Sequence, residues 1–411
     1  MNESEVRISV KGLRPGMYVS RLDRPWLETP HLMQGFRVES DEQALEVARY
    51  SQYVYIDVKR GVVPDPNYVL HGGGAGRDKP LKESLPAMGS VAYENRTSLP
   101  DEMESAQEAR DRLESVTGEV LTDLREGKEL DLDALKDSVR VMIDSIVRNP
   151  EAMAWLAKIK RKDTYTYHHS LGASIWAATF ARHLGLPRKE IELLALAGLL
   201  LDVGKIKLSP ELLNDPNRLD PGQMEEMRKH VDFSIELLRE IEDVDPKLLA
   251  MVGTHHERYD GSGYPGGLKG EEIPLYGRIA AIVDTYDALT SLRPYAQAMS
   301  PHGAVGLLYE WRGIDFQPEL VEQFIQAIGI YPTGTLVELN TGEVGVIISL
   351  NGLRRLRPRV MVLLDAEKKP YSEFREIDLM VETQLPDGSR LDIKRGLPPG
   401  SHGIDPKELF L

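Results

Sequence analysis

The sequence predicts a mainly α-helical protein with a small β-rich unit at each end. Three observations favour this fold class. Apolar residues recur at helical spacing through residues 102–330. They alternate with polar residues near the start of the chain and again after Pro332. A stretch rich in Gly, Pro, Ser and charge lies between the first unit and the helices.

These changes of pattern divide the chain, which at 411 residues is too long for one ordinary core. We expect residues 1–70 to form a small β-rich domain with a regulatory role, and residues 71–101 to form a flexible linker. Residues 102–330 are expected to form the helical domain, with connecting helices up to about residue 150. Residues 331–411 are expected to form a small β extension.

The first unit alternates Val6, Ile8 and Val10 with polar residues, and residues 53–58 are a second strand candidate. Residues 40–50 between them are typical of a short helix. In the linker, the glycine-rich run at residues 72–76 is followed by neither Lys-Ser nor Lys-Thr, and no strand or helix is predicted around it. We therefore interpret it as a linker and not as a phosphate-binding loop.

The helical region has a clear start signal at Asp220-Pro221, where the acid caps the helix and proline takes its first position. Apolar residues continue on one side of that helix as far as Ile241. Residues 191–201 are apolar nearly all round, which predicts a helix buried on every face. Residues 247–256 and 275–292 carry apolar residues at helical spacing.

After Pro332 the apolar period becomes two, which is typical of strands. Four short strands are predicted, at residues 335–339, 344–350, 359–364 and 376–380. Together they indicate a small β-barrel-like extension after the helical domain.

Composition excludes several classes of function. The chain has no cysteine, so disulfides, thiolate nucleophiles and cysteine-ligated zinc are excluded, and a cytoplasmic protein is expected. Its formal net charge of −15 argues against binding to DNA or RNA polymers, which need many cationic side chains. It does not argue against a small anionic ligand. No apolar run is long enough to predict a membrane span.

Polar residues interrupt the apolar helix faces at six places. They are His169, Asp202, His230, His255, His256 and Asp284. A carboxylate among apolar neighbours is costly unless a cation or hydrogen-bond donors neutralise it. Four imidazoles and two carboxylates make a ligand set of nitrogen and oxygen that suits iron, manganese or zinc. A shared carboxylate such as Asp202 could bridge two ions, and a paired metal site activates water against a phosphodiester.

Each of these residues also has an ordinary structural interpretation. A single histidine on an apolar helix face is more often a hydrogen-bonded core residue than a ligand. Asp284 could pair with Arg278, and His255 with His256 could be surface residues at a helix end. The metal interpretation depends on the segment that follows.

That segment resembles the signature of bacterial HD-GYP domains. It reads HHERYDGSGYP at residues 255–265, and continues with GLKG at 267–270, IPL at 273–275, DALT at 287–290 and RPY at 293–295. The YTYHHS run at residues 165–170 resembles the family's first histidine motif. The resemblance covers roughly residues 150–330, and the units on either side are similar to those that accompany such domains.

The resemblance implies an HD-type all-helical metal-binding domain that hydrolyses cyclic di-GMP to pGpG or GMP. It implies two divalent metal ions, most often iron or manganese, with zinc as an alternative. The implied metal ligands are His169, Asp202, His230, His255, His256 and Asp284, with Asp202 bridging and also catalytic. The implied substrate-binding residues are Lys205, which is also catalytic, Gly263, Tyr264, Pro265 and Arg293.

The sequence departs from the family pattern at the His-Asp pair that gives the family the letters HD. Leu201-Asp202 stands at that place. One metal would keep only His169, Asp202 and Asp284, and that site is expected to be the weaker one. His168 is a poor substitute, since adjacent helical side chains point about 100° apart. Tyr165 replaces the glutamate of three-metal members. Ala296 replaces a second basic residue.

Three functions remain open at this point. The first is a cyclic di-GMP phosphodiesterase with activity reduced by the missing histidine. The second is a catalytically inactive sensor that binds cyclic di-GMP without cleaving it. The third is an interaction module that contacts signalling proteins through the Gly-Tyr-Pro loop. The sequence leaves the oligomeric state and the input to the first domain open.

Overall fold

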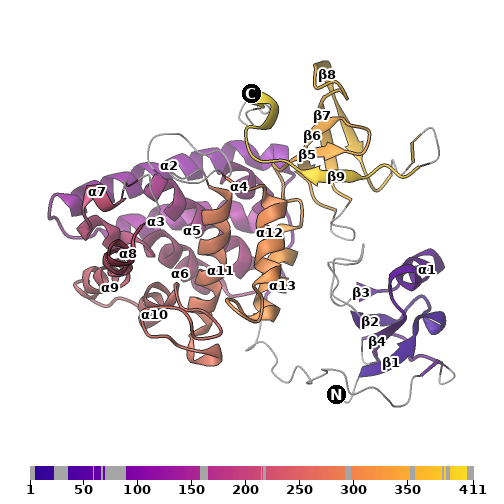
Figure 1. Ribbon diagram of the computed structural model, residues 1–411, viewed down its shortest axis with the longest axis horizontal. Coiled ribbons are helices and arrows are strands. Elements are labelled where there is room, and N and C mark those ends of the chain that lie inside the picture. Colours follow the sequence, from indigo (N-terminus) through magenta and orange to yellow (C-terminus); the bar gives the residue numbers. More distant parts are fainter. Residues whose placement is uncertain are drawn as a thin grey trace. The chain divides into compact units, whose positions relative to one another are not determined.

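Figure 1 shows the fold of the protein in a computed structural model. The structure describes residues 5–22, 36–58, 60–65, 68–69, 89–157, 165–213, 215, 219–291, 298–351, 357–381, 384–385 and 389–404. These residues form two compact units that divide near residue 88, and each is described by itself. The mainly helical fold class with β regions at both ends is confirmed.

The first unit is a four-stranded antiparallel sheet covered by one helix. Its strands β1 (Glu5–Ser9), β2 (Tyr18–Leu22), β3 (Phe36–Arg37) and β4 (Tyr53–Asp57) lie in the order β1-β4-β2-β3. Helix α1 (Asp41–Tyr50) begins after Ser40, whose hydroxyl accepts from the Gln43 amide. The core is formed by every second strand residue, because these side chains point to the same face of the sheet. Ile8, Val54 and Ile56 belong to it and have no exposed surface. The expected strand and helix at residues 40–58 are therefore present.

The second unit begins with a stretch bound to the helical domain. Val91 donates its amide to the Gly185 carbonyl and the Tyr93 hydroxyl donates to the Leu186 carbonyl. Helices α2 (Leu99–Arg125) and α3 (Leu132–Arg148) follow and pack against each other (Figure 1). Arg148 forms a two-pronged ion pair with the buried Glu102, which ties the end of α3 to the start of α2.

Seven further helices form the rest of the core in the described part of the helical domain. These are α4 (Pro150–Leu156), α5 (Tyr165–His183), α6 (Arg188–Leu200), α10 (Pro246–Thr254), α11 (Leu275–Thr290), α12 (Pro301–Glu310) and α13 (Pro318–Ile328). Helices α5, α6 and α11 are buried along most of their length. Trp176 of α5 meets Tyr286 of α11 edge to face, and Tyr286 meets Phe324 of α13 in the same way. This aromatic core fixes the helices that carry the polar residues singled out above.

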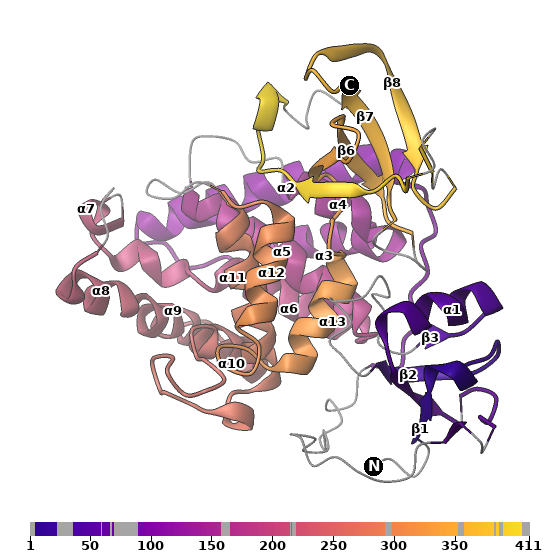
Figure 2. The ribbon, with the colours of Figure 1, turned by 45° about the vertical axis from the view of Figure 1, so that its right-hand side comes forward.

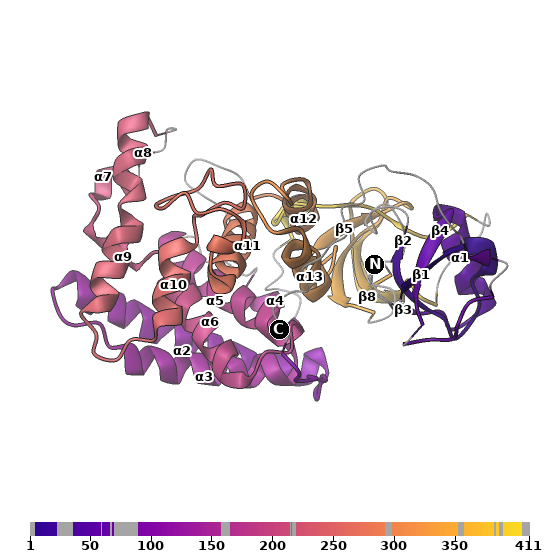
Figure 3. The same cartoon turned by 90° about the horizontal axis from the view of Figure 1, so that it is seen from below.

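The helix expected to run on from Asp220-Pro221 is instead two helices. Helix α8 (Pro221–Arg228) has the expected cap, with the Asp220 carboxylate accepting from the Gln223 amide, but it has no buried residue. The chain turns at Lys229, and α9 (His230–Arg239) then packs on α10 and on the 3₁₀ turn Val203–Lys207. A short helix, α7 (Pro210–Leu213), precedes α8, and both lie at the edge of the helical domain (Figure 3).

The chain ends in a five-stranded antiparallel sheet. Strands β5 (Leu336–Leu339), β6 (Val344–Ser349), β7 (Arg359–Leu364), β8 (Pro370–Asp378) and β9 (Ile393–Gly396) lie in the order β8-β7-β6-β5-β9. Figure 1 labels all five strands, and Figure 2 shows β6, β7 and β8 from a second direction. Strand β8 begins earlier than the predicted 376–380, and β9 was not predicted. This sheet belongs to the same compact unit as the helices.

Candidate metal centre

One half of the candidate centre is a chain of buried side chains from α5 and α11. His169, in the second turn of α5, has its Nε2 2.8 Å from Oδ1 of Asp284 and its Nδ1 2.8 Å from Oδ2 of Asp287. Burial alone would lower the pKa of His169, but the hydrogen bonds with Asp284 and Asp287 raise it to about 9. Without a metal, the imidazole is therefore protonated and donates to both carboxylates.

Asp202 lies at the end of α6, where the helix passes into the 3₁₀ turn. Its Oδ2 is 2.6 Å from Nζ of Lys205 and 3.8 Å from Nε2 of His169, while its Oδ1 is 3.2 Å from Nε2 of His230. Burial would raise the pKa of Asp202, but the Lys205 ammonium and His230 hold it well below its usual range. Asp202 is thus a buried carboxylate with one oxygen directed to each half of the centre.

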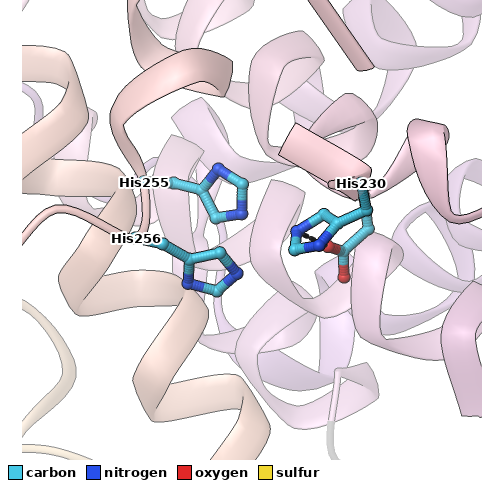
Figure 4. A group of neighbouring side chains, drawn as sticks. His230, His255 and His256 are labelled. Carbon is cyan, nitrogen blue, oxygen red and sulfur yellow. Dashed lines mark ion pairs between the residues drawn. The ribbon is translucent and has the colours of Figure 1, made fainter. Parts of the chain in front are cut away.

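The other half is formed by three imidazoles. His230 opens α9, and His255 and His256 directly follow α10; Figure 4 shows the three rings turned toward one another. Nδ1–H of His230 donates to the Met227 carbonyl and Nδ1–H of His255 donates to the Val252 carbonyl, at 2.7 and 2.6 Å. This arrangement leaves each Nε2 with its lone pair available.

Three buried atoms at this point have no hydrogen-bond partner among the residues that the structure describes. They are Nε2 of His230, Nε2 of His255 and Oδ1 of Asp202. His230 and Asp202 approach to 3.2 Å, but not in hydrogen-bond geometry. Burial lowers the pKa of His255 to about 4 and that of His256 well below its usual range, so both rings are neutral. Unpaired ring nitrogens and a carboxylate oxygen that lie within 4.8 Å of one another fit a divalent metal ion.

The ligand atoms fall into two groups that share one residue. Asp202, His230, His255 and His256 form one group, and His169, Asp202 and Asp284 form the other. Within each group the ligand atoms lie within 4.8 Å of one another. Leu201, which directly precedes Asp202, is buried and offers no lone pair; the second group has three residues where the first has four.

The Gly-Tyr-Pro loop lies against the four-residue group. The ring of Tyr264 contacts that of His256 in a tilted arrangement, with centroids 4.7 Å apart and an interplanar angle of 31°. The buried Glu257 carboxylate accepts from the amides of Gly266 and Leu268, at 2.6 and 2.9 Å, and so holds the loop. A Cβ atom at Gly263 would lie 2.3 Å from the backbone nitrogen of Arg258, so only glycine fits there.

Two of these supporting residues were not singled out from the sequence. Asp287 has no exposed surface and also accepts from Trp176 and Ser291, while Glu257 organises the loop. A signal was available for Asp287, since it follows Asp284 by three residues and therefore lies on the same helix face. Gly172 makes room for it, because a side chain there would lie 2.0 Å from Oδ1 of Asp287.

The remaining predicted residues divide into two sets. Lys205 contacts Asp202 and Tyr264 contacts His256, and Gly263 and Pro265 flank Tyr264 in the chain. Arg293 and Ala296 lie outside the described residues, as do the side chains of Tyr165 and His168. No helix in the described part of the chain is long and apolar enough to cross a membrane.

Three family models match successive parts of the chain. Residues 140–320 match a model described as HD domain, residues 5–135 match a domain of unknown function, and residues 336–385 match a KOW domain associated with HD domain. The first match contains every described residue of the centre.

Three curated proteins are similar in sequence. A cyclic di-GMP phosphodiesterase of Pseudomonas aeruginosa is 34% identical over 91% of this chain and 88% of its own length. The cyclic di-GMP phosphodiesterase response regulator RpfG of Xanthomonas campestris is 38% identical over 44% of this chain and 48% of its own. The 3′3′-cGAMP-specific phosphodiesterase 2 of Vibrio cholerae is 32% identical over 46% of this chain and 37% of its own.

Proposed function

The chain belongs to the HD-GYP family of cyclic di-GMP phosphodiesterases, and on that premise we propose that it is a metal-dependent hydrolase of cyclic di-GMP. The product would be linear pGpG or GMP. The observation that carries the proposal is the convergence of unpaired ligand atoms from His230, His255 and Asp202 in the buried four-residue group.

The proposed ligands are the residues of the two groups, with Asp202 shared between them. Divalent ions bound there would supply a water activated for attack at neutral pH and would neutralise charge on the phosphate. Iron or manganese is proposed, with zinc as an alternative, because the donors are nitrogen and oxygen only. The three-residue group is proposed as the weaker site, because Leu201 cannot contribute a ligand.

The proposed substrate contacts surround this cluster. Lys205 carries an ammonium 2.6 Å from the Asp202 carboxylate and can donate to a phosphate oxygen beside it. Tyr264, with Gly263 and Pro265, would border the substrate next to His256. Arg293 is proposed as a further phosphate contact from the sequence alone.

Leu201 supports a second candidate function. A chain that binds one metal firmly in the four-residue group, and the other weakly, could bind cyclic di-GMP as a sensor without cleaving it. Contact of the Gly-Tyr-Pro loop with signalling proteins also stays a proposal. Three other features also stay proposals. They are the domain boundaries at residues 70, 101 and 330, the regulatory role of the first domain, and a cytoplasmic location.

The test is a product assay combined with metal analysis. Protein purified without oxygen is analysed for iron, manganese and zinc, then incubated with cyclic di-GMP and Mn²⁺ or Fe²⁺, with 3′3′-cGAMP as the competing substrate. We expect linear product from the wild type and none from His230→Ala. His183→Ala, which removes an imidazole paired with Gln323 outside the centre, is the matched control.

Two results would contradict the proposal in different ways. Calorimetric binding of cyclic di-GMP without linear product at high protein concentration would favour the sensor. Faster cleavage of 3′3′-cGAMP than of cyclic di-GMP would change the assigned substrate but not the reaction.

A further inference from the structure

An exposed arginine lies at the outer side of the Gly-Tyr-Pro loop. Arg228 is the last residue of α8, and its guanidinium carbon lies 4.8 Å from the ring centroid of Tyr264. That ring in turn contacts the ring of His256. Two successive ring contacts therefore connect this cation to the edge of the metal centre.

The cations around Arg228 already have polar partners. Nζ of Lys229 is 2.5 Å from the Glu226 carboxylate, and Lys205, beside Asp202, is already assigned to the phosphate at the metal centre. Arg258 donates to the carbonyls of its own loop segment. Among the residues that the structure describes, no carboxylate lies within ion-pair distance of Arg228. Its five donors are thus available to a ligand.

The chemistry of the proposed substrate requires a second anion-binding group. A cyclic dinucleotide carries two phosphodiesters on one macrocycle, so while one is at the metal centre the other remains close to it. A planar guanidinium that is partly supported by an aromatic ring is well suited to such a phosphate. The exposed α8 brings this group to the centre from outside the buried helices.

We propose that Arg228 binds the phosphodiester that is not being cleaved. This inference rests on the proposed function, since it requires a ligand with two phosphates. It gives the exposed helix α8 a role in selecting dinucleotides over substrates with a single phosphodiester.

The test compares two neutralising variants at adjacent positions of the full chain. Arg228→Gln and Lys229→Gln each remove one positive charge, but only Arg228 contacts Tyr264. Binding of cyclic di-GMP to the metal-loaded proteins is measured by calorimetry. We expect the Kd to rise about 10- to 100-fold in Arg228→Gln, and less than about twofold in Lys229→Gln.

Two further measurements separate substrate binding from support of the loop. Metal content should be unchanged in both variants. The kcat/KM for bis(p-nitrophenyl) phosphate, which has one phosphodiester, should also stay at the wild-type value. Equal Kd values in the two variants would overturn the inference. Loss of metal, or equal loss toward both substrates, would overturn it too, because Arg228 would then act by supporting Tyr264 and His256.

The wild-type arm tests the proposed function separately. Wild-type protein that neither binds nor cleaves cyclic di-GMP would remove the proposed function and this inference together. Normal wild-type binding with an unaffected Arg228→Gln variant would remove this inference alone.

Discussion

Nδ1 of His169 lies 2.8 Å from Oδ2 of Asp287, and this contact joins α5 to α11 behind the metal centre. Both side chains are buried, and the other ring nitrogen of His169 faces Asp284. A carboxylate behind a histidine fixes which nitrogen is available and how the ring is turned. The three-residue ligand group is therefore supported by a buried carboxylate behind its histidine.

Asp287→Asn should weaken metal binding by the three-residue group. The amide keeps the shape of the side chain but loses the charge that orients His169, so we expect a loss of about 10- to 100-fold in affinity there. Titration of the metal-free protein with Mn²⁺ measures it. Ser291→Ala is the control, because it removes a donor to the same carboxylate and leaves the His169 contact in place. Unchanged affinity in Asp287→Asn would show that the contact only stabilises the fold.

Leu201→His should strengthen the weaker site and increase the rate of hydrolysis. An imidazole at this buried position adds the donor that leucine lacks, so we expect metal content to rise and affinity at that site to improve at least about tenfold. Metal analysis and the product assay are the measurements. Leu201→Met has a similar volume and serves as the control. A histidine variant no different from it would contradict the account of the defect.

The metal-free protein should be most stable near pH 6.5. The folded state raises the pKa of His169 to about 9, so its stabilising effect is complete below about pH 6.5 and is lost as the pH rises through 9. The effect is on the order of 3 kcal/mol. His255, with its pKa lowered to about 4, acts in the opposite direction, and stability falls as the pH drops below 6.5.

Urea unfolding with a chelator present, from pH 5 to 9.5, measures both limbs of this profile. His169→Gln should remove the decline above pH 6.5 and leave the acid limb in place. An identical alkaline decline in the wild type and in this variant would assign it to other groups.

Glu257→Gln should loosen the Gly-Tyr-Pro loop. The carboxylate accepts from two loop amides, whereas an amide side chain has one acceptor oxygen, so one N–H loses its partner. We expect a loss of about 1–3 kcal/mol in the free energy of unfolding and a higher KM for cyclic di-GMP. Urea unfolding and steady-state kinetics measure the two effects. Glu271→Gln, on the exposed part of the same segment, is the control.

Strong apolar periods predicted the central helices well. The apolar run at residues 191–201 corresponds to α6, and the segment at 275–292 corresponds to α11. The weaker patterns were less informative. Strand β9 reads Ile-Lys-Arg-Gly and is held partly by the ion pair between Arg395 and the buried Glu338, which no local pattern reveals. Most of β8 is exposed, so its first residues lack the alternation that would mark a strand.

The candidate site was predicted from a motif and not from periodicity. His230 and His255 each lie on an apolar helix face, where a histidine has no distinctive local signal. The residues that support them were harder to predict. Asp287 and Glu257 act through hydrogen bonds to residues and amides that only the folded chain brings near. Arg228 was missed for the same reason, since its contact with Tyr264 crosses between two separate segments.

The ligand residues come from α5, the end of α6, the start of α9, the end of α10 and α11. Two bound ions would therefore join five segments of the helical domain between them, three at each ion with Asp202 shared, and their binding energy would add to the stability of the packing. The abundance of this protein in a cell would then follow the supply of the metal. Starvation for that metal would lower the amount of the protein through degradation. It would also stop catalytic turnover by the protein that remains.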